Sequence, residues 1–420
     1  MVSDEHTLPW LACIREEVPG LELFDVHTHI GSNDPDGYRS STQELVSALE
    51  LARASAAVFP MHEPEGYGPA NDMVLAEAAA SDGVLTAFCR LDPEDGPLAE
   101  VERCLAAGAR GIKLHPRAEG FTLDHPALRG VFELANERRL PVLVHAGRGI
   151  PALGRHAVEL TGTFPGLRLI LAHAGICDLA WIWRAAREHP NLFFDSAWWT
   201  PSDLLALFAL VPPGQVLFGS DAPYATPVFS VGTSLRCALQ VGLTAEQVLS
   251  VAGAQARRLV AGEDPVDLGP APGPDSLVAD PLLDRVYSFL LSAIGQMLRG
   301  IEPEETLQLA ALACEVGADA PQAPVCRSVL ELIEARARYE PRPGERPPRF
   351  APGLHLIVLA ATACRTPNVR LPAVCTEPAR VDRSTGPSES FDGLHGTPDG
   401  DGGPSYSSGS STKISKPRAG

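Results

Sequence analysis

The sequence predicts an α/β protein built on a (β/α)8 barrel, the TIM-barrel architecture, with a C-terminal helical appendage and a disordered tail. Three observations lead to this prediction. Eight short apolar runs alternate with segments of helical spacing between residues 21 and 262. That span is close to the roughly 250 residues that such a barrel usually needs. Histidine and aspartate residues stand at the carboxyl ends of several runs, where barrel enzymes build their sites.

The eight runs are nearly continuous in apolar residues, as expected for parallel strands that are covered on both faces. They are residues 21–26, 56–60, 84–91, 110–115, 141–145, 167–173, 191–196 and 215–220. Helix start signals lie between them. Ser41 with Glu44, and Thr244 with Gln247, have the spacing of a capping box, and Asp124 is placed to cap the helix after the fourth run.

A doubly wound open sheet is the alternative architecture for alternating strands and helices. Such a sheet usually carries a glycine-rich phosphate turn after its first strand. The first run here ends in the sequence HTH, and the chain contains no GxGxxG motif. The barrel is therefore the preferred prediction.

The character of the chain changes after the last run. Residues 263–275 are rich in Pro and Gly and predict a domain boundary. Residues 276–339 have helical spacing and form an appendage that either packs on the barrel or makes a dimer contact. Residues 340–420 are poor in apolar residues and predict a mostly disordered tail. The expected barrel domain is thus 21–262.

Composition narrows the class of protein. Of the 420 residues, 45% are hydrophobic and 20% charged, as in a soluble globular protein. The formal charge of −18 argues against partners such as nucleic acid or an anionic membrane surface. The nine cysteines form no CxxC pair, which favours free thiols in a reducing compartment. Neither a signal peptide nor a membrane-spanning stretch is evident, so we expect a cytoplasmic protein.

The stretch FDVHTHIG contains the first candidate for a metal site, His27 and His29. Side chains two residues apart on a strand share a face, so both imidazoles can approach one ion. Alone, this spacing also fits ordinary strand-end histidines. His145 and His173 end the fifth and sixth runs, however, and Asp221 follows the eighth. Burying five unpaired ionisable groups at one mouth is costly, and a divalent cation removes that cost.

Several motifs together resemble the amidohydrolase superfamily of metal-dependent barrels. They are DVHTHIG, the NDMVLAEAA to FCRLDP stretch, GIKLHP, VLVHAG, LILAHAG, FFDSAW, FGSDAPY and GAQARRL. The resemblance covers residues 21–262 and is strongest to the amidohydrolase-related branch that includes the aminocarboxymuconate-semialdehyde decarboxylase group. These motifs are specific for the superfamily and much less specific for a reaction.

The resemblance implies a ligand set and catalytic roles. His27, His29, His145 and Asp221 would bind a catalytic divalent metal, and His173 would act with Asp221 as acid and base. Zinc suits His and carboxylate ligands, and it lowers the pKa of a bound water to about 7, so that hydroxide is available at neutral pH. Manganese and iron suit the same ligands.

Three positions are candidates for contact with the substrate. Lys113 in GIKLHP either binds a substrate anion or, as in binuclear superfamily members, bridges two metals as a carbamate. His115, two residues later, is either a substrate contact or a strand-end hydrogen-bond donor. Arg148 in HAGRG either clamps a substrate carboxylate or is a solvated loop residue.

Two further features lie at the seventh run. Asp195 ends this run and either orients a site histidine or has an ordinary strand-end role. Trp198 and Trp199 follow and form either an apolar wall at the mouth or part of the packing.

The leading functional hypothesis is a metal-dependent hydrolase acting on a C–N or related bond of a small polar substrate. A non-oxidative decarboxylase on the same metal site is the first alternative, because a site of this kind also serves to protonate carbon and release CO₂. A metal-free barrel that binds a ligand is the second. The expected partner is a small molecule, with a homodimer as a further option and neither nucleic acid nor membrane.

Overall fold

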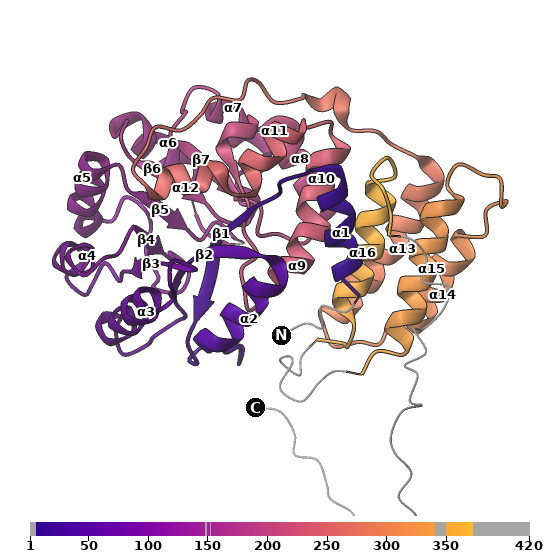
Figure 1. The fold of residues 1–420 in the computed structure, drawn as a ribbon, viewed down its shortest axis with the longest axis horizontal. Helices are drawn as coiled ribbons and strands as arrows, with labels where there is room; N and C mark the ends of the chain where they lie inside the picture. Colours follow the sequence, from indigo (N-terminus) through magenta and orange to yellow (C-terminus); the bar gives the residue numbers. More distant parts are fainter. Residues whose placement is uncertain (1–5, 148, 152, 341–349, 373–420) are drawn as a thin grey trace, which may run out of the picture. The chain divides into compact units, whose positions relative to one another are not determined.

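The computed structural model describes residues 6–147, 149–151, 153–340 and 350–372 (Figure 1). It contains eight parallel strands, in agreement with the eight predicted runs. The strands are β1 (Leu23–Ile30), β2 (Ala54–Pro60), β3 (Leu85–Arg90), β4 (Gly111–Leu114), β5 (Pro141–Val144), β6 (Arg168–Leu171), β7 (Leu192–Asp195) and β8 (Val216–Leu217). Each strand pairs with the next one along the chain, in the order β1 to β8.

The sheet closes between its first and last strands. The Val26 amide donates to the Phe218 carbonyl at 3.0 Å, and the His29 amide donates to the Ala222 carbonyl at 2.8 Å. The Asp221 amide donates in turn to the carbonyl of His27 at 2.8 Å. The fold is therefore the predicted (β/α)8 barrel, and its closing seam passes through candidate site residues.

Helices alternate with the strands around the barrel. They are α1 (Leu8–Glu17), α2 (Thr42–Ala52), α3 (Gly68–Ala80), α4 (Pro97–Ala106), α5 (Arg129–Arg138), α6 (Leu153–Thr163), α7 (Leu179–Ala186), α8 (Pro201–Leu210), α9 (Pro227–Ser230), α10 (Arg236–Gln240), α11 (Ala245–Leu249) and α12 (Gln255–Val260). Two π-helical segments, η4 (Val231–Leu235) and η5 (Ser250–Ala254), join α9 to α10 and α11 to α12.

Two of the predicted caps are present and one is not. Ser41 with Glu44 caps α2, and Thr244 with Gln247 caps α11, both as complete capping boxes. The helix after β4 is instead capped by the ring of His125, which accepts from the Ala127 amide at 3.3 Å. Asp124 lies one residue too early for this role, and its carboxylate accepts a hydrogen bond from Thr122.

Two apolar layers hold the barrel together. The interior of the barrel is filled by side chains from the strands together with two residues of α12. The members of this cluster are Phe24, Val26, Ala57, Phe59, Phe88, Leu143, Ile170, Ala172, Phe193, Leu217, Ala256 and Leu259. A larger cluster lies between the strands and the surrounding helices. Both faces of the strands are therefore buried, as the continuous apolar runs predicted.

The appendage contains four helices, α13 (Pro281–Met297), α14 (Glu304–Ala313), α15 (Ala323–Ala337) and α16 (Leu354–Arg365). The first three fall within the predicted appendage. Helix α16 falls within 340–420, where mostly disordered chain was expected, so the prediction was wrong for this segment. Every residue from His355 to Cys364 is buried, because α16 packs between α13, α15 and the barrel. Residues 341–349 and 373–420 of that predicted tail lie outside the described residues.

The appendage is fixed to the barrel. Its core includes Trp10 of α1 and Phe229 of α9 in addition to its own helices. The fully buried Arg236 of α10 donates to the hydroxyl and carbonyl of Thr366 and to the carbonyls of Val369 and Arg370. Barrel and appendage form one compact unit, and α1 lies beside α16 at their junction (Figure 1).

Two further expectations concern cysteines and membranes. The eight cysteines in the described part of the chain are all free thiols. Among the described helices, none has the length and apolar character needed to cross a membrane.

Candidate metal centre and active-site cavity

An irregularity in β1 directs both histidines of FDVHTHIG toward the inside of the barrel. The pairing of β1 with β2 shifts between Asp25 and Thr28. Phe24, before the shift, and Val26, within it, both belong to the interior core. The next residue, His27, also turns inward, and the rings of His27 and His29 pack against Phe59 of the same core, with centroids 5.5 and 4.5 Å away. Irregular pairing of this kind redirects side chains and is frequent beside active sites.

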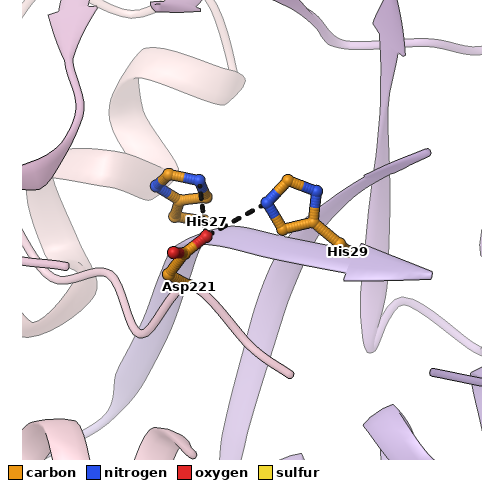
Figure 2. Close-up of side chains that lie close together, drawn as sticks. All are labelled: His27, His29 and Asp221. Atoms are coloured by element: carbon orange, nitrogen blue, oxygen red, sulfur yellow. Dashed lines mark hydrogen bonds and ion pairs between the residues drawn. The ribbon is translucent and has the colours of Figure 1, made fainter. Parts of the chain in front are cut away.

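Asp221 brings the two histidines to one point. The Nε2 atoms of His27 and His29 lie 3.0 and 3.1 Å from the same oxygen, Oδ1 of Asp221. Figure 2 shows the two rings and the carboxylate converging on this atom. Their ligand atoms all lie within 4.8 Å of one another. A compact group of two imidazoles and one carboxylate is what a divalent transition metal takes from a protein.

Asp195 at the end of β7 orients this group. Its Oδ2 lies 2.7 Å from Nδ1 of His27, which leaves Nε2 of that ring facing Asp221. Its Oδ1 accepts from the backbone amides of His173 and Ala197 at 2.7 and 3.0 Å. A carboxylate on the far nitrogen of a ligating histidine fixes the tautomer and the ring plane. Of the two roles expected for Asp195, the structure shows the hydrogen bond to a site histidine.

Two candidate site residues have left-handed backbone conformations. The φ angles of His173 and Asp221 are 56° and 62°. Such a conformation costs a residue with a β-carbon about 1–2 kcal/mol. It persists because Asp195 holds the His173 amide and the barrel seam holds the Asp221 amide. Strain that the surrounding structure imposes is characteristic of functional positions.

Burial sets the charge of this group. Burial lowers the pKa of His29 to about 3 and lowers that of His173 below its ordinary value. Burial and Lys113 also oppose protonation of His27, but Asp221 and Asp195 outweigh them and raise its pKa. Burial opposes ionisation of Asp221, yet His27 and the other histidines hold its pKa well below the usual range. At neutral pH the site therefore offers a carboxylate anion and neutral imidazole nitrogen.

The residues present fit a divalent cation. Nδ1 of His29 and Nε2 of His145 are buried and have no hydrogen-bond partner within the described part of the chain. The carboxylate of Asp221 and the neutral His29 ring supply one anionic and one neutral ligand without prior loss of a proton. Coordination also relieves the crowding of buried polar groups at the seam.

His145 lies outside the three-residue group. Its Nδ1 is 2.9 Å from Nε2 of His173, and its ring stacks on His115 with centroids 3.9 Å apart. Gly147 leaves room for this arrangement, since a β-carbon there would lie 2.6 Å from Nε2 of His145. His173 also makes a ring contact with His27 at 5.1 Å. The four predicted metal ligands and the predicted acid–base residue His173 therefore lie together, with His27, His29 and Asp221 as the tightest group.

The three predicted substrate contacts have different positions. Lys113 is fully buried, with its Nζ 3.2 Å from Nε2 of His27, and burial lowers its pKa to about 7. It therefore sits beneath the candidate metal ligands. His115 stacks against His145 and holds the Ala118 amide through Nδ1. Arg148 lies outside the described residues.

A cavity of about 520 Å³ opens over the metal-site residues. His145, His173 and Asp221 line its barrel end, and Trp198 and Trp199 form part of its wall, which is one of the two roles considered for these aromatics. Its size is in the range of small-molecule sites, which is about 300–1,000 Å³.

Sequence reasoning missed several residues around this cavity. Arg117 lines it from the loop after β4, and Asp36 and Tyr38 line it from the loop after β1. The motif GIKLHPR contains Arg117 two residues after His115, which was the available signal. No pattern in the loop after β1 marked Asp36 or Tyr38.

A buried ion pair at the end of β3 was also missed. Nη2 of Arg90 lies 2.7 Å from Oε1 of Glu119, and the Tyr67 hydroxyl donates to the same oxygen at 2.6 Å. Arg90 also donates to the Pro60 carbonyl at 3.3 Å. This network ties the loop after β4 to β2 and β3, and so fixes the segment that carries Arg117.

Comparison with known families identifies the class of protein. A profile of the amidohydrolase family matches residues 24–287, which is more than half of the chain. The chain therefore belongs to the amidohydrolase family, as its motifs indicated. The match contains all the candidate metal-site residues and ends within α13. No curated protein sequence matches the chain.

Solved structures of similar arrangement include three named enzymes. The 5-carboxyvanillate decarboxylase of Sphingomonas paucimobilis is 16% identical, with 58% of this chain and 99% of that chain covered and a TM-score of 0.46. The 2,6-dihydroxybenzoate decarboxylase of Rhizobium is 15% identical (58% and 98% covered, TM-score 0.46). The 4-oxalomesaconate hydratase of Rhodopseudomonas palustris is 14% identical (57% and 96% covered, TM-score 0.43). Likeness at this level says nothing of the reaction that this chain catalyses.

Proposed function

We propose that this protein is a metal-dependent hydrolase that cleaves a C–N or related bond of a small polar substrate. The observation that carries the proposal is the convergence of His27 and His29 on one oxygen of Asp221 at 3.0 and 3.1 Å. These three residues hold the cation, and His145 completes the ligand set. Zinc is the expected metal, with manganese or iron as alternatives.

The cation supplies Lewis-acid chemistry, which polarises a substrate carbonyl and makes water a nucleophile at neutral pH. The residues of the chain supply the rest. Asp221 is the proposed base toward the attacking water, because its carboxylate is ionised at neutral pH and lies beside the atoms of His27 and His29 that would hold the cation. Asp195 keeps the His27 ring in its ligating tautomer.

His173 is the proposed acid toward the leaving group. Its Nδ1 lies 2.9 Å from the Ala197 carbonyl, so this nitrogen carries the proton and Nε2 is left as the basic atom. Nε2 faces Nδ1 of His145 at 2.9 Å at the floor of the cavity. The proton that the attacking water loses to Asp221 would be relayed to Nε2 of His173 and from there to the amine as the C–N bond breaks, which balances the hydrolysis to an acid and an amine.

Non-oxidative decarboxylation is the second candidate. The observation that favours it is Arg117, a guanidinium that lines the same cavity and suits a carboxylate substrate. In that reaction the C–C bond to the carboxylate breaks, CO₂ leaves, and His173 delivers a proton to the carbon that retains the electron pair.

Metal analysis tests the proposal first. Full-length protein purified without chelators should contain close to one divalent ion per chain or regain it from added zinc or manganese. A content under ~0.1 per chain that added metal does not restore would contradict both enzymatic candidates and favour a metal-free binding barrel.

The reaction is then tested with the metal-loaded protein. A panel of amides, lactones and aryl or alkenyl carboxylates is assayed in parallel for hydrolysis and for released CO₂. Hydrolysis without CO₂ supports the first candidate and contradicts the second, and release of CO₂ alone does the reverse.

A further inference from the structure

The cavity above the metal-site residues has a second half, which the appendage builds. Beyond the barrel residues it is lined by Ile294 of α13, by Leu298 directly after that helix and by Val358 of α16. The family match ends at residue 287, so these positions lie beyond it. The appendage therefore contributes directly to the site that the barrel carries.

The two halves differ in chemistry. Asp36, Arg117, His145, His173 and Asp221 all come from the barrel. The appendage residues that line the cavity are apolar except for Tyr339 and His355, whose rings lie 5.1 Å apart. Ile294 and Val358 belong to the buried appendage core, and Leu298 and Leu354 pack on that core as partly buried side chains. The cavity therefore meets the appendage core mainly through Leu298 and Leu354, whereas ionisable side chains line its barrel end.

A continuous aromatic wall joins the halves. The Trp198 ring lies 6.2 Å from that of His173 and 5.9 Å from that of Trp199. Trp199 packs in turn against the appendage core, which includes Phe229. This wall gives a ligand that touches His173 an aromatic surface leading toward the appendage core.

The far wall is preformed. Helix α16 is bound to the barrel through Arg236 and the carbonyls that follow the helix. The Ser202 and Tyr287 hydroxyls pair at 3.0 Å between α8 and α13. A fixed apolar wall binds an apolar group without the cost of ordering a loop.

We propose that the appendage half of the cavity is a subsite for an apolar tail, and that the substrate is a carboxylate whose polar head lies at the barrel mouth. The tail is an alkyl or acyl chain, or a ring system of similar size, that packs between Trp199, Leu298 and Val358. Arg117 lines the barrel end of the cavity, and its guanidinium is the proposed partner of the carboxylate head. This inference rests on the proposed function, which places the reacting end of the substrate beside His173.

Straight-chain carboxylates test the subsite by calorimetry on the full-length protein. Butanoate, hexanoate and octanoate share a head and differ only in tail, and octanedioate carries a second charge at the tail. Each buried methylene should tighten binding about fourfold. Octanoate should therefore bind far more tightly than butanoate, and octanedioate should lose most of that gain. Equal affinity for butanoate and octanoate, or for octanoate and octanedioate, would overturn the subsite.

Two variants locate the effect. Leu298→Trp fills the appendage half of the cavity. In this variant the affinity should no longer rise with the length of the carboxylate, and the affinity for butanoate should stay within about twofold of the unmodified protein. Leu291→Trp is the matched control, because Leu291 lies on the exposed side of α13 and is 37% exposed. This variant should bind both butanoate and octanoate with unchanged affinity. Val358→Phe provides a second filling variant from α16 should Leu298→Trp fail to fold. An unchanged chain-length dependence in the folded filling variant would contradict the proposal.

The same titrations separate this inference from the proposed function. They are repeated with metal-free and zinc-loaded protein. The gain per methylene reports the apolar subsite and should be equal in both forms. The affinity for the shared head reports the metal centre, so its insensitivity to zinc would count against the proposed function alone.

Discussion

The barrel mouth and the appendage line the same cavity but bury different kinds of side chain: ionisable groups at the mouth and apolar groups in the appendage. At the mouth, histidines, a lysine and aspartates are buried within hydrogen-bond distance of one another, and two of them have strained backbones. The appendage core consists almost entirely of aliphatic and aromatic side chains. The first arrangement costs stability unless a cation binds, whereas the second provides stability through burial alone.

The difference shows how function and stability are divided between the two regions. Unpaired buried charge is expensive, and at the barrel mouth Asp195 and the hydrogen bonds it makes hold the histidine ligands in place. The appendage is attached to the barrel by shared apolar packing, with Trp10 and Phe229 in its core, and by the hydrogen bonds of the buried Arg236. Variants on either side should therefore fail in different ways.

The largest effect is expected at the metal ligands. Asp221→Asn removes the negative charge that both histidines face and should reduce bound metal to under ~0.1 per chain, with loss of turnover. Metal content by mass spectrometry of the purified protein is the measurement. Asp36→Asn is the matched control on the rim of the same cavity and should retain its metal. Full metal content in Asp221→Asn would remove this residue from the ligand set.

A variant pair sharpens the roles of the two neighbouring histidines. His145→Ala should remove most of the bound metal, whereas His173→Ala should retain it and lose about 10²–10⁴-fold in turnover, the usual contribution of an acid–base group. Metal content and turnover are measured on the same samples. Equal metal loss in both variants would show that His173 is also a ligand.

Stability should respond most to the attachment of the appendage. Arg236→Met leaves several buried carbonyls without a donor, and each should cost about 1–3 kcal/mol of the free energy of unfolding. Denaturant unfolding followed by circular dichroism measures the change. The control Arg338→Met alters a side chain that is 75% exposed and should cost less than about 1 kcal/mol. Similar losses in both would mean that Arg236 is dispensable for docking.

The smallest expected effect concerns two helix caps, Asp280 at the start of α13 in the appendage and Thr244 at the start of α11 in the barrel. Their contributions to the free energy of unfolding should depend differently on pH. Burial opposes ionisation of Asp280, but hydrogen bonds from Gln322, Leu283 and Leu282 outweigh it and hold its pKa below 3.8. Its contribution is therefore complete above the unfolded value near 4 and is lost as pH falls through the lower folded value.

Asp280→Ala should cost about 1 kcal/mol at pH 7 and little near pH 2. Thr244→Ala, at the α11 cap of the barrel, removes an uncharged side chain, so its cost from the lost cap should not show this pH dependence. Unfolding free energies at several pH values test the pair, and the same pH profile for both variants would contradict the assignment.

The sequence predicted the barrel well because its signals are local and repeated. Each strand is a short apolar run, and His27, His29, His145 and His173 lie in or directly after such runs, so strand order alone places them at one mouth. Asp221 follows from the same reasoning. Their convergence required no knowledge of distant contacts.

The cavity wall was not predictable in the same way. The segment that forms α16 is apolar on all sides, a pattern that marks a helix buried on every face but does not say against what. Its surroundings are rich in proline, and the composition of residues 340–420 as a whole favoured disorder. The ion pair of Arg90 and Glu119 joins residues distant in sequence, and no periodicity links them.

The position of α16 along the chain bears on how the site is assembled during synthesis. Asp221, the last of the proposed ligands, follows β8 and precedes Phe350 and Val358, which line the cavity, by a long stretch of chain. Chains begin to fold from their N-terminal parts as they are made. All the proposed ligands are therefore synthesised before α16, which adds the last part of the cavity lining.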